Sequence, residues 1–128
     1  MRADTRAGRE YVQSVLDLYV RLPTTRSTPS RQDRRLAALL HQRAVPLGLV
    51  RAALLLAAAR RTMRSPDASP LPPIGCLHYF LPVIDELRNS PPDPGYVDYL
   101  YSKLEPFMKH KPDQRSTAGQ KTSLSTGR

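Results

Sequence analysis

Apolar residues recur at spacings of three and four in five segments of the chain, and prolines separate most of these segments. The segments cover about residues 9–22, 31–43, 46–63, 76–89 and 96–107. Such spacings place apolar side chains on one face of an α-helix, so each segment predicts a helix. No run of useful length alternates apolar and polar residues with the period of two that a half-buried strand requires.

The third segment is the most apolar part of the chain. Residues 52–59 are all alanine or leucine, and Leu49 and Val50 precede them. A helix that is apolar almost all round is packed by several neighbours, whereas a helix that spans a bilayer needs about 20 apolar residues. We therefore expect an all-α fold, a compact bundle of four to five helices around this central apolar helix, and no membrane segment.

Residues at the ends of the segments support these helix boundaries. Ser30 is suited to cap the second helix, and Asp33 three positions later resembles a capping box with Asp in place of Glu. Pro46 suits the first position of the third helix. Pro82 lies inside the fourth segment, so we expect a kink there or a first turn that ends near Leu81.

The length of 128 residues allows one domain and is too short for two ordinary ones. We predict a flexible N-terminus over residues 1–7 and a single helical domain over residues 8–108. Residues 109–128 contain Leu124 as their one large aliphatic side chain, with Lys, Ser, Thr, Gly and Gln throughout. Such a composition predicts a disordered basic tail.

The net charge of +9 is unevenly distributed along the chain. Residues 1–64 hold thirteen arginines and four acids, residues 65–108 have a net charge of −4, and residues 109–128 have a net charge of +4. A basic half beside an acidic half indicates one surface that faces a polyanion and a separate surface for another partner. An arginine excess also follows from a GC-rich genome, and solvated basic faces are common, so that explanation stays open.

Arginines gather at the start of the second predicted helix and at the end of the third. The third helix is too apolar to read base edges in a major groove, so a helix-turn-helix role is disfavoured. Side chains at these two ends would instead contact phosphates, which position a protein on DNA without reading its sequence. The candidate nucleic-acid-binding residues are Arg31, Arg34, Arg35, Arg60, Arg61 and Arg64.

Motifs of common active sites are absent from the sequence, including a glycine-rich phosphate loop, G-x-S-x-G and H-E-x-x-H. Cys76 and His78 are two residues apart, so on a helix they diverge, and nothing nearby completes a set of four metal ligands. Asp85 and Glu86 are adjacent and diverge in the same way. We therefore predict no catalytic residue, no cofactor and no metal site, and we expect that the protein is not an enzyme.

Cysteine usage and the first residues bear on the cellular compartment. One cysteine allows no disulfide framework within a chain and suits a reducing environment. Residues 1–10 are polar and charged, without the apolar core of a signal peptide. We expect a cytoplasmic protein.

The segment from Tyr79 and Phe80 to Ile84 resembles the aromatic-aromatic-x-x-x-Ile motif of DnaD-like domains. The likeness covers about residues 31–88 and includes the order of a polar helix, an apolar helix with a basic end, and the aromatic motif. Arg88 stands where that family usually has a tryptophan. DnaD-like domains are helical domains of replication-initiation and helicase-loading proteins, including those of phages and mobile elements. The resemblance therefore implies a role in replication.

These features lead to two hypotheses from different classes. The first is a non-enzymatic DNA-binding accessory protein of replication or a mobile genetic element, which contacts the DNA backbone with low sequence specificity and has a replication or recombination protein as a further partner. The alternative is a protein-interaction or scaffold module that docks through its acidic region, Asp85–Glu105, and has no direct nucleic-acid role. Tyrosines of that region are expected in the core or at an interface, because an acidic surface disfavours base stacking.

Overall fold

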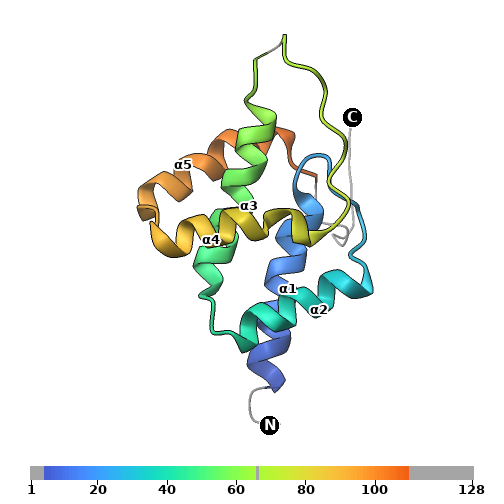
Figure 1. The fold of residues 1–128 in the computed structure, drawn as a ribbon, viewed down its shortest axis with the longest axis vertical. Coiled ribbons are helices and arrows are strands. Elements are labelled where there is room, and N and C mark those ends of the chain that lie inside the picture. Colours follow the sequence, from blue (N-terminus) through green and yellow to red (C-terminus); the bar gives the residue numbers. More distant parts are fainter. Residues whose placement is uncertain (1–4, 66, 110–128) are drawn as a thin grey trace, which may run out of the picture.

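Five α-helices and two short 3₁₀ helices make up the described part of the chain, residues 5–65 and 67–109 of a computed structural model (Figure 1). Within these two ranges there is no strand, so the predicted all-α fold is confirmed. In chain order the elements are α1 (Thr5–Arg21), α2 (Arg31–Gln42), α3 (Leu47–Thr62), η2 (Leu77–Phe80), α4 (Leu81–Asn89), α5 (Pro94–Leu104) and η3 (Glu105–Phe107).

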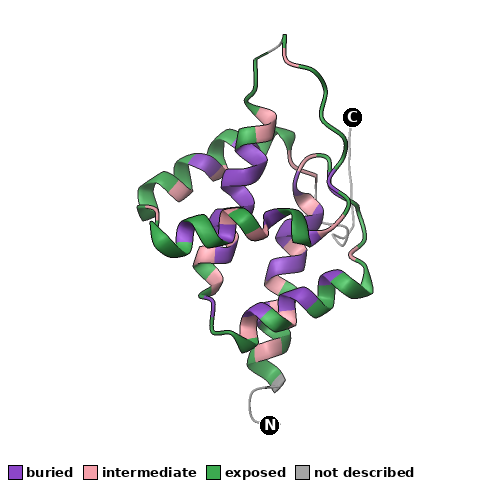
Figure 2. Ribbon diagram, viewed as in Figure 1, coloured by how far each residue is buried: buried purple, intermediate pink, exposed green. Residues whose placement is uncertain are grey.

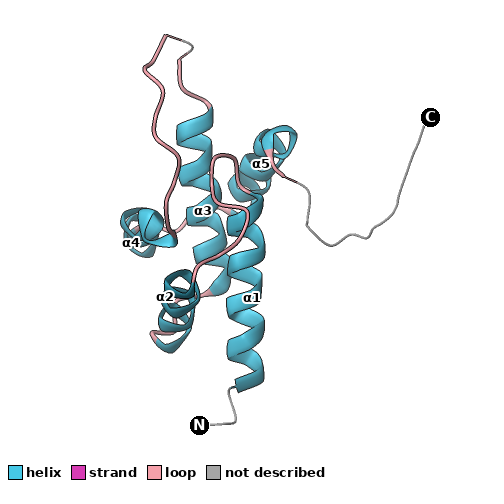
Figure 3. Ribbon diagram, turned by 90° about the vertical axis from the view of Figure 1, so that its right-hand side faces the viewer, coloured by secondary structure: helices cyan, strands magenta, loops and turns pink. Residues whose placement is uncertain are grey.

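Helix α3 is the centre of the bundle, as its composition predicts. Val50 and all eight residues from 52 to 59 are buried, and the helix contacts α1, α4 and α5. Figure 2 shows its buried surface continuing round the helix, whereas α2, α4 and α5 each expose one side. In the side view of Figure 3, α2 and α4 lie on one side of α3, and α1 and α5 lie on the other.

Helix α1 begins four residues before the predicted start at residue 9. Residues 5–7, which the sequence analysis placed in a flexible N-terminus over residues 1–7, are helical, and residues 1–4 lie outside the described ranges. Apolar spacing alone could not locate this start, because the first turns are exposed. The carboxylate of Glu10 lies 3.5 Å from Nε of Arg6 one turn earlier, a pairing that supports a solvent-facing turn.

The start of α2 has the predicted capping box. The Ser30 hydroxyl accepts a hydrogen bond from the Asp33 backbone N–H at 3.1 Å, and the Ser30 N–H donates to Oδ2 of Asp33 at 2.9 Å. The other oxygen, Oδ1, accepts from the Leu77 N–H at 2.9 Å, and Asp33 is fully buried. One carboxylate therefore fixes the start of α2 and attaches η2 to it.

The fourth apolar segment is divided into η2 and α4, with the break at Phe80 and Leu81. Pro82 falls in the first turn of α4, where a missing N–H removes no helical hydrogen bond, so the expected short first turn is observed. Phe80 is fully buried and meets Tyr19 of α1 edge to face, with ring centroids 6.0 Å apart. Phe80 thus packs the end of η2, directly before α4, against α1.

Lys109, predicted as the first residue of the tail, is bonded to the end of α1. Its backbone N–H donates to the Arg21 carbonyl at 2.7 Å, and its ammonium donates to the Thr25 carbonyl at 2.6 Å. Partial burial lowers the pKa of Lys109. The folded domain therefore extends one residue beyond the predicted boundary at 108, and the rest of the predicted tail, residues 110–128, lies outside the described residues.

Candidate nucleic-acid interface

The first two turns of α2 present three arginines to solvent. Arg31, Arg34 and Arg35 are all exposed, and within the described part of the chain none of them forms an ion pair. The apolar stripe of α2, with Leu36 and Leu40, is buried instead. These three side chains lie together on one outward surface of α2, which we call the α2 arginine surface.

Asp33 is the only carboxylate of α2, and it is turned away from this surface. Its side chain is 0% exposed, and both oxygens accept backbone hydrogen bonds. Cations near a helix N-terminus oppose the helix dipole by a few tenths of a kcal/mol each, and an anion in the first turn opposes that effect. The turn thus keeps its buried anion, while the charged side chains that it exposes are all arginines.

A shallow groove of about 300 Å³ adjoins the α2 arginine surface. Gln32, Arg35 and Leu39 of α2 line it together with His78 of η2, and no carboxylate is among its lining residues. Sequence spacing could not place His78 here, because the contact depends on the hydrogen bond between Leu77 and Asp33, 44 residues apart. The imidazole is a neighbour of Arg35 that the sequence analysis missed.

Arg60, at the end of α3, is held within the domain. Its two terminal nitrogens donate to the two carboxylate oxygens of Glu86 at 2.9 and 2.7 Å, a bidentate pair between α3 and α4. The guanidinium lowers the pKa of the Glu86 carboxyl through these hydrogen bonds. Because the pair is internally neutral, Arg60 offers a polyanion less net charge than the α2 arginines do.

Arg61 and Arg64 hold the segment that follows α3. Arg61 donates to the Pro72 carbonyl at 2.5 Å and to the Tyr79 hydroxyl at 3.3 Å, and its guanidinium lies 5.3 Å from the centre of the Tyr79 ring. Arg64 donates to the Ser69 carbonyl at 2.8 Å. These contacts go to neutral acceptors, so both arginines keep their net charge.

The two predicted arginine groups do not form a single cluster. In Figure 1 the end of α3 is at the top of the molecule, and the start of α2 is at the lower right. Between them lies η2, with His78 beside Arg35 and Tyr79 beside Arg61. The structure thus gives two basic sites, of which only the α2 arginine surface combines exposure with the absence of described internal partners.

Two further features concern residues 5–65 and 67–109, namely metal ligands and membrane-spanning helices. No three His, Cys, Asp or Glu side chains of these residues are grouped so that they could hold a metal ion. None of the described helices has the length and apolar character to cross a membrane.

Comparisons with protein-family models, with curated proteins and with solved structures found no match. The resemblance to DnaD-like domains thus depends on the aromatic motif and the order of the helices over about residues 31–88. Phe80 and Ile84 of that motif are buried in the core, whereas Tyr79 is 42% exposed and contacts Arg61.

Proposed function

We propose that this protein is a non-enzymatic, cytoplasmic accessory protein that binds the DNA backbone through the α2 arginine surface and helps to recruit replication or mobile-element machinery. One observation carries the DNA-binding part: Arg31, Arg34 and Arg35 all face solvent without a described ion pair, while the only acid of their helix is buried. The replication part comes from the resemblance to DnaD-like domains.

The spacing of the three arginines suits a run of phosphates. Residues 31 and 35 are separated by about 6 Å along the helix axis, at a rise of about 1.5 Å per residue. A DNA strand carries one phosphate per about 3.4 Å of duplex axis, so the cluster spans about two steps between phosphates, or about three phosphates of a strand. One guanidinium group can donate two parallel hydrogen bonds to a phosphate, and such contacts are independent of base sequence.

A comparison at equal charge tests whether the site, rather than the net charge of the chain, binds DNA. One variant replaces Arg31, Arg34 and Arg35 with Ala. The control variant replaces Arg9, Arg43 and Arg88 with Ala. These three arginines are also exposed, and they lie in α1, directly after α2 and in α4, respectively. Fluorescence anisotropy with two unrelated labelled duplexes at low salt measures the dissociation constants.

We expect the first variant to bind both duplexes at least tenfold more weakly than the wild type, and the control variant to lose much less. Equal losses in the two variants would show that only total charge matters. Circular dichroism must first show that both variants keep the helix content of the wild type.

A second function is favoured by a separate observation on α5. Tyr96 and Tyr99 are 45% and 54% exposed, and their rings stack with centroids 6.2 Å apart. Exposed tyrosines are typical of protein interfaces, and the surrounding segment has a net negative charge within a chain that is basic as a whole. If the wild-type protein shows no DNA binding at low salt, a protein-interaction module that docks through Asp85–Glu105 becomes the preferred function.

A further inference from the structure

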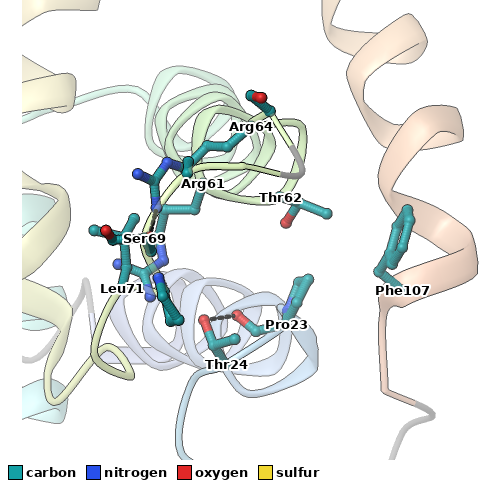
Figure 4. Close-up of a pocket in the computed structure, with 11 residues that line it drawn as sticks. Pro23, Thr24, Arg61, Thr62, Arg64, Ser69, Leu71 and Phe107 are labelled. Carbon is teal, nitrogen blue, oxygen red and sulfur yellow. Dashed lines mark hydrogen bonds between the residues drawn. The ribbon is translucent and has the colours of Figure 1, made fainter.

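A pocket of about 380 Å³ lies at the end of α3 (Figure 4). Figure 4 shows Arg61 and Arg64 on one side of it, Thr62 and Pro23 near its middle, and Phe107 across from the two arginines. Its walls come from three parts of the chain, which are the last turn of α3 with the segment after it, the turn after α1, and η3. The residues that line the pocket are Pro23, Thr24, Arg61, Thr62, Arg64, Ser65, Ala68, Ser69, Pro70, Leu71 and Phe107.

The polar part of this pocket is suited to an anion. It combines two guanidinium groups with four hydroxyl side chains, and no carboxylate is among the described residues that line it. The C-terminal end of a helix carries the equivalent of about half a negative charge. Two guanidinium charges exceed that, so the local balance is positive. A phosphate group, which takes several hydrogen bonds from hydroxyls and guanidiniums, matches this set of donors.

The two arginines are already held in place before any ligand arrives. Arg64 is fixed by the Ser69 carbonyl and Arg61 by the Pro72 carbonyl and Tyr79, and an arginine has five N–H donors, so each has donors left. Nε of Arg61 is buried and has no hydrogen-bond partner among the described residues. Binding would therefore require little loss of side-chain freedom at these two residues.

Two apolar side chains of the pocket are exposed, Phe107 across from the arginines and Leu71 on the arginine side (Figure 4). Phe107 is 54% exposed and Leu71 is 43% exposed, although both are large apolar side chains. Thr24, on the opposite wall, has a φ of 65°, a left-handed conformation that is strained for a β-branched residue and recurs at binding sites. An exposed phenylalanine facing two arginines provides a surface on which a flat ring can stack.

We propose that this pocket binds a nucleotide, with the phosphate held by Arg61 and Arg64 and the base against Phe107. Its volume lies within the range of about 300–1,000 Å³ that is usual for small-molecule sites. The nucleotide is either a free nucleoside monophosphate or an unpaired nucleotide of a DNA strand, since both present the same chemistry. The site goes beyond the proposed function and shares no residue with the α2 arginine surface, so each can fail alone.

Titrations of the full-length protein followed by nuclear magnetic resonance test this site. The ligands are AMP, adenosine and inorganic phosphate, and the signals are the backbone amides and the arginine Nε–H groups. We expect AMP to shift the Arg61 and Arg64 Nε–H signals and the backbone amides of Thr24 and Phe107, with adenosine and phosphate each binding at least fivefold more weakly than AMP.

Two variants separate the phosphate and base contacts. Arg64→Gln should weaken AMP binding about tenfold, and Phe107→Ala should weaken AMP binding about tenfold but leave phosphate binding unchanged. Arg88→Gln, an exposed arginine of α4 with no place in the pocket, should leave AMP binding as in the wild type. Well-dispersed spectra identify folded variants, and Phe107→Leu replaces Phe107→Ala if the latter unfolds.

Two further titrations distinguish a free nucleotide from a strand end. One uses a 5′-phosphorylated single DNA strand of six nucleotides, and the other uses the same strand without its 5′-phosphate. Signals of the pocket that respond to AMP alone indicate a free nucleotide, and signals that respond to the phosphorylated strand in preference to the other strand indicate a strand end. The proposal is overturned if these signals shift neither with AMP at about 10 mM nor with the phosphorylated strand at about 1 mM. It is also overturned if AMP binds no more tightly than inorganic phosphate to both the wild type and Phe107→Ala.

Discussion

Asp33 is the residue on which both the local structure and the proposed surface depend. Its carboxylate caps α2 through Ser30 and holds η2 through the Leu77 N–H. Because these two bonds keep the carboxylate at 0% exposure, the arginines on either side of it face solvent without a competing acid. Burial of this one side chain thus leaves the exposed surface without an acid.

Replacing Asp33 with Ala should lower the free energy of unfolding by about 2–4 kcal/mol, because two backbone donors lose an ionised acceptor and the Leu77 donor is buried. Asp33→Asn keeps one carbonyl oxygen and should fall between this variant and the wild type. Urea denaturation followed by circular dichroism measures the change. The control is Asp98→Ala on α5, which is exposed and should change the free energy by less than about 0.5 kcal/mol. Equal values for Asp33→Ala and Asp98→Ala would contradict the assigned role of Asp33.

Local sequence could predict only part of this residue-scale arrangement. Ser30 and Asp33 are three positions apart, so the capping box is visible in the sequence. The bond from Asp33 to Leu77 and the pair of Arg60 with Glu86 join segments 44 and 26 residues apart. Those pairings depend on how the helices pack, and no spacing in the sequence encodes them. For this reason the sequence analysis predicted both arginine groups as phosphate contacts, whereas the structure shows that they differ in their internal partners.

Helix α3 shows how much an apolar pattern can establish at the scale of an element. Its central position follows from eight successive apolar residues, and they are all buried. The start of α1 did not follow in the same way, because its first turn at Thr5 lies outside the apolar pattern. Apolar periodicity reports which residues pack, so it locates buried turns and misses exposed ones.

Replacing Leu54 with Asp should unfold the protein or make it aggregate, because an unpaired carboxylate would be placed at a site with 0% exposure in α3. Thermal unfolding followed by circular dichroism measures the effect. Leu39→Asp on α2 makes the same chemical change at a side chain that is 37% exposed, and it should keep a cooperative transition near that of the wild type. A wild-type melting temperature for Leu54→Asp would rule out a central α3.

At the scale of the whole molecule, charge and exposed aromatic groups are distributed over separate regions. The α2 arginine surface, the pocket beside Arg61 and the tyrosine pair of α5 use different residues. Sequence composition indicated the division between a basic half and an acidic half. It could not indicate the pocket, because Thr24, Arg61 and Phe107 are brought together only by the packing of α1, α3 and η3.

The end of the domain gives a prediction at this scale. A chain that ends at Lys109 should keep the melting temperature of the full chain, because residues 110–128 have almost no apolar side chains to pack. A chain that ends at Met108 should melt several degrees lower, because it loses the bonds from Lys109 to Arg21 and Thr25. Differential scanning calorimetry compares the two. A large loss in the chain that ends at Lys109 would show that residues 110–128 stabilise the domain.

The salt dependence of DNA binding tests the proposed function most directly. Each phosphate neutralised on duplex DNA contributes about −0.9 to the slope of log affinity against log salt concentration. We predict a steep slope for the wild type and a slope flatter by up to about three units when Arg31, Arg34 and Arg35 are replaced with Ala. The control variant at Arg9, Arg43 and Arg88 should keep a slope close to that of the wild type. An unchanged slope in the folded α2 variant, or no detectable binding of the wild type at low salt, would contradict DNA binding through the α2 arginine surface.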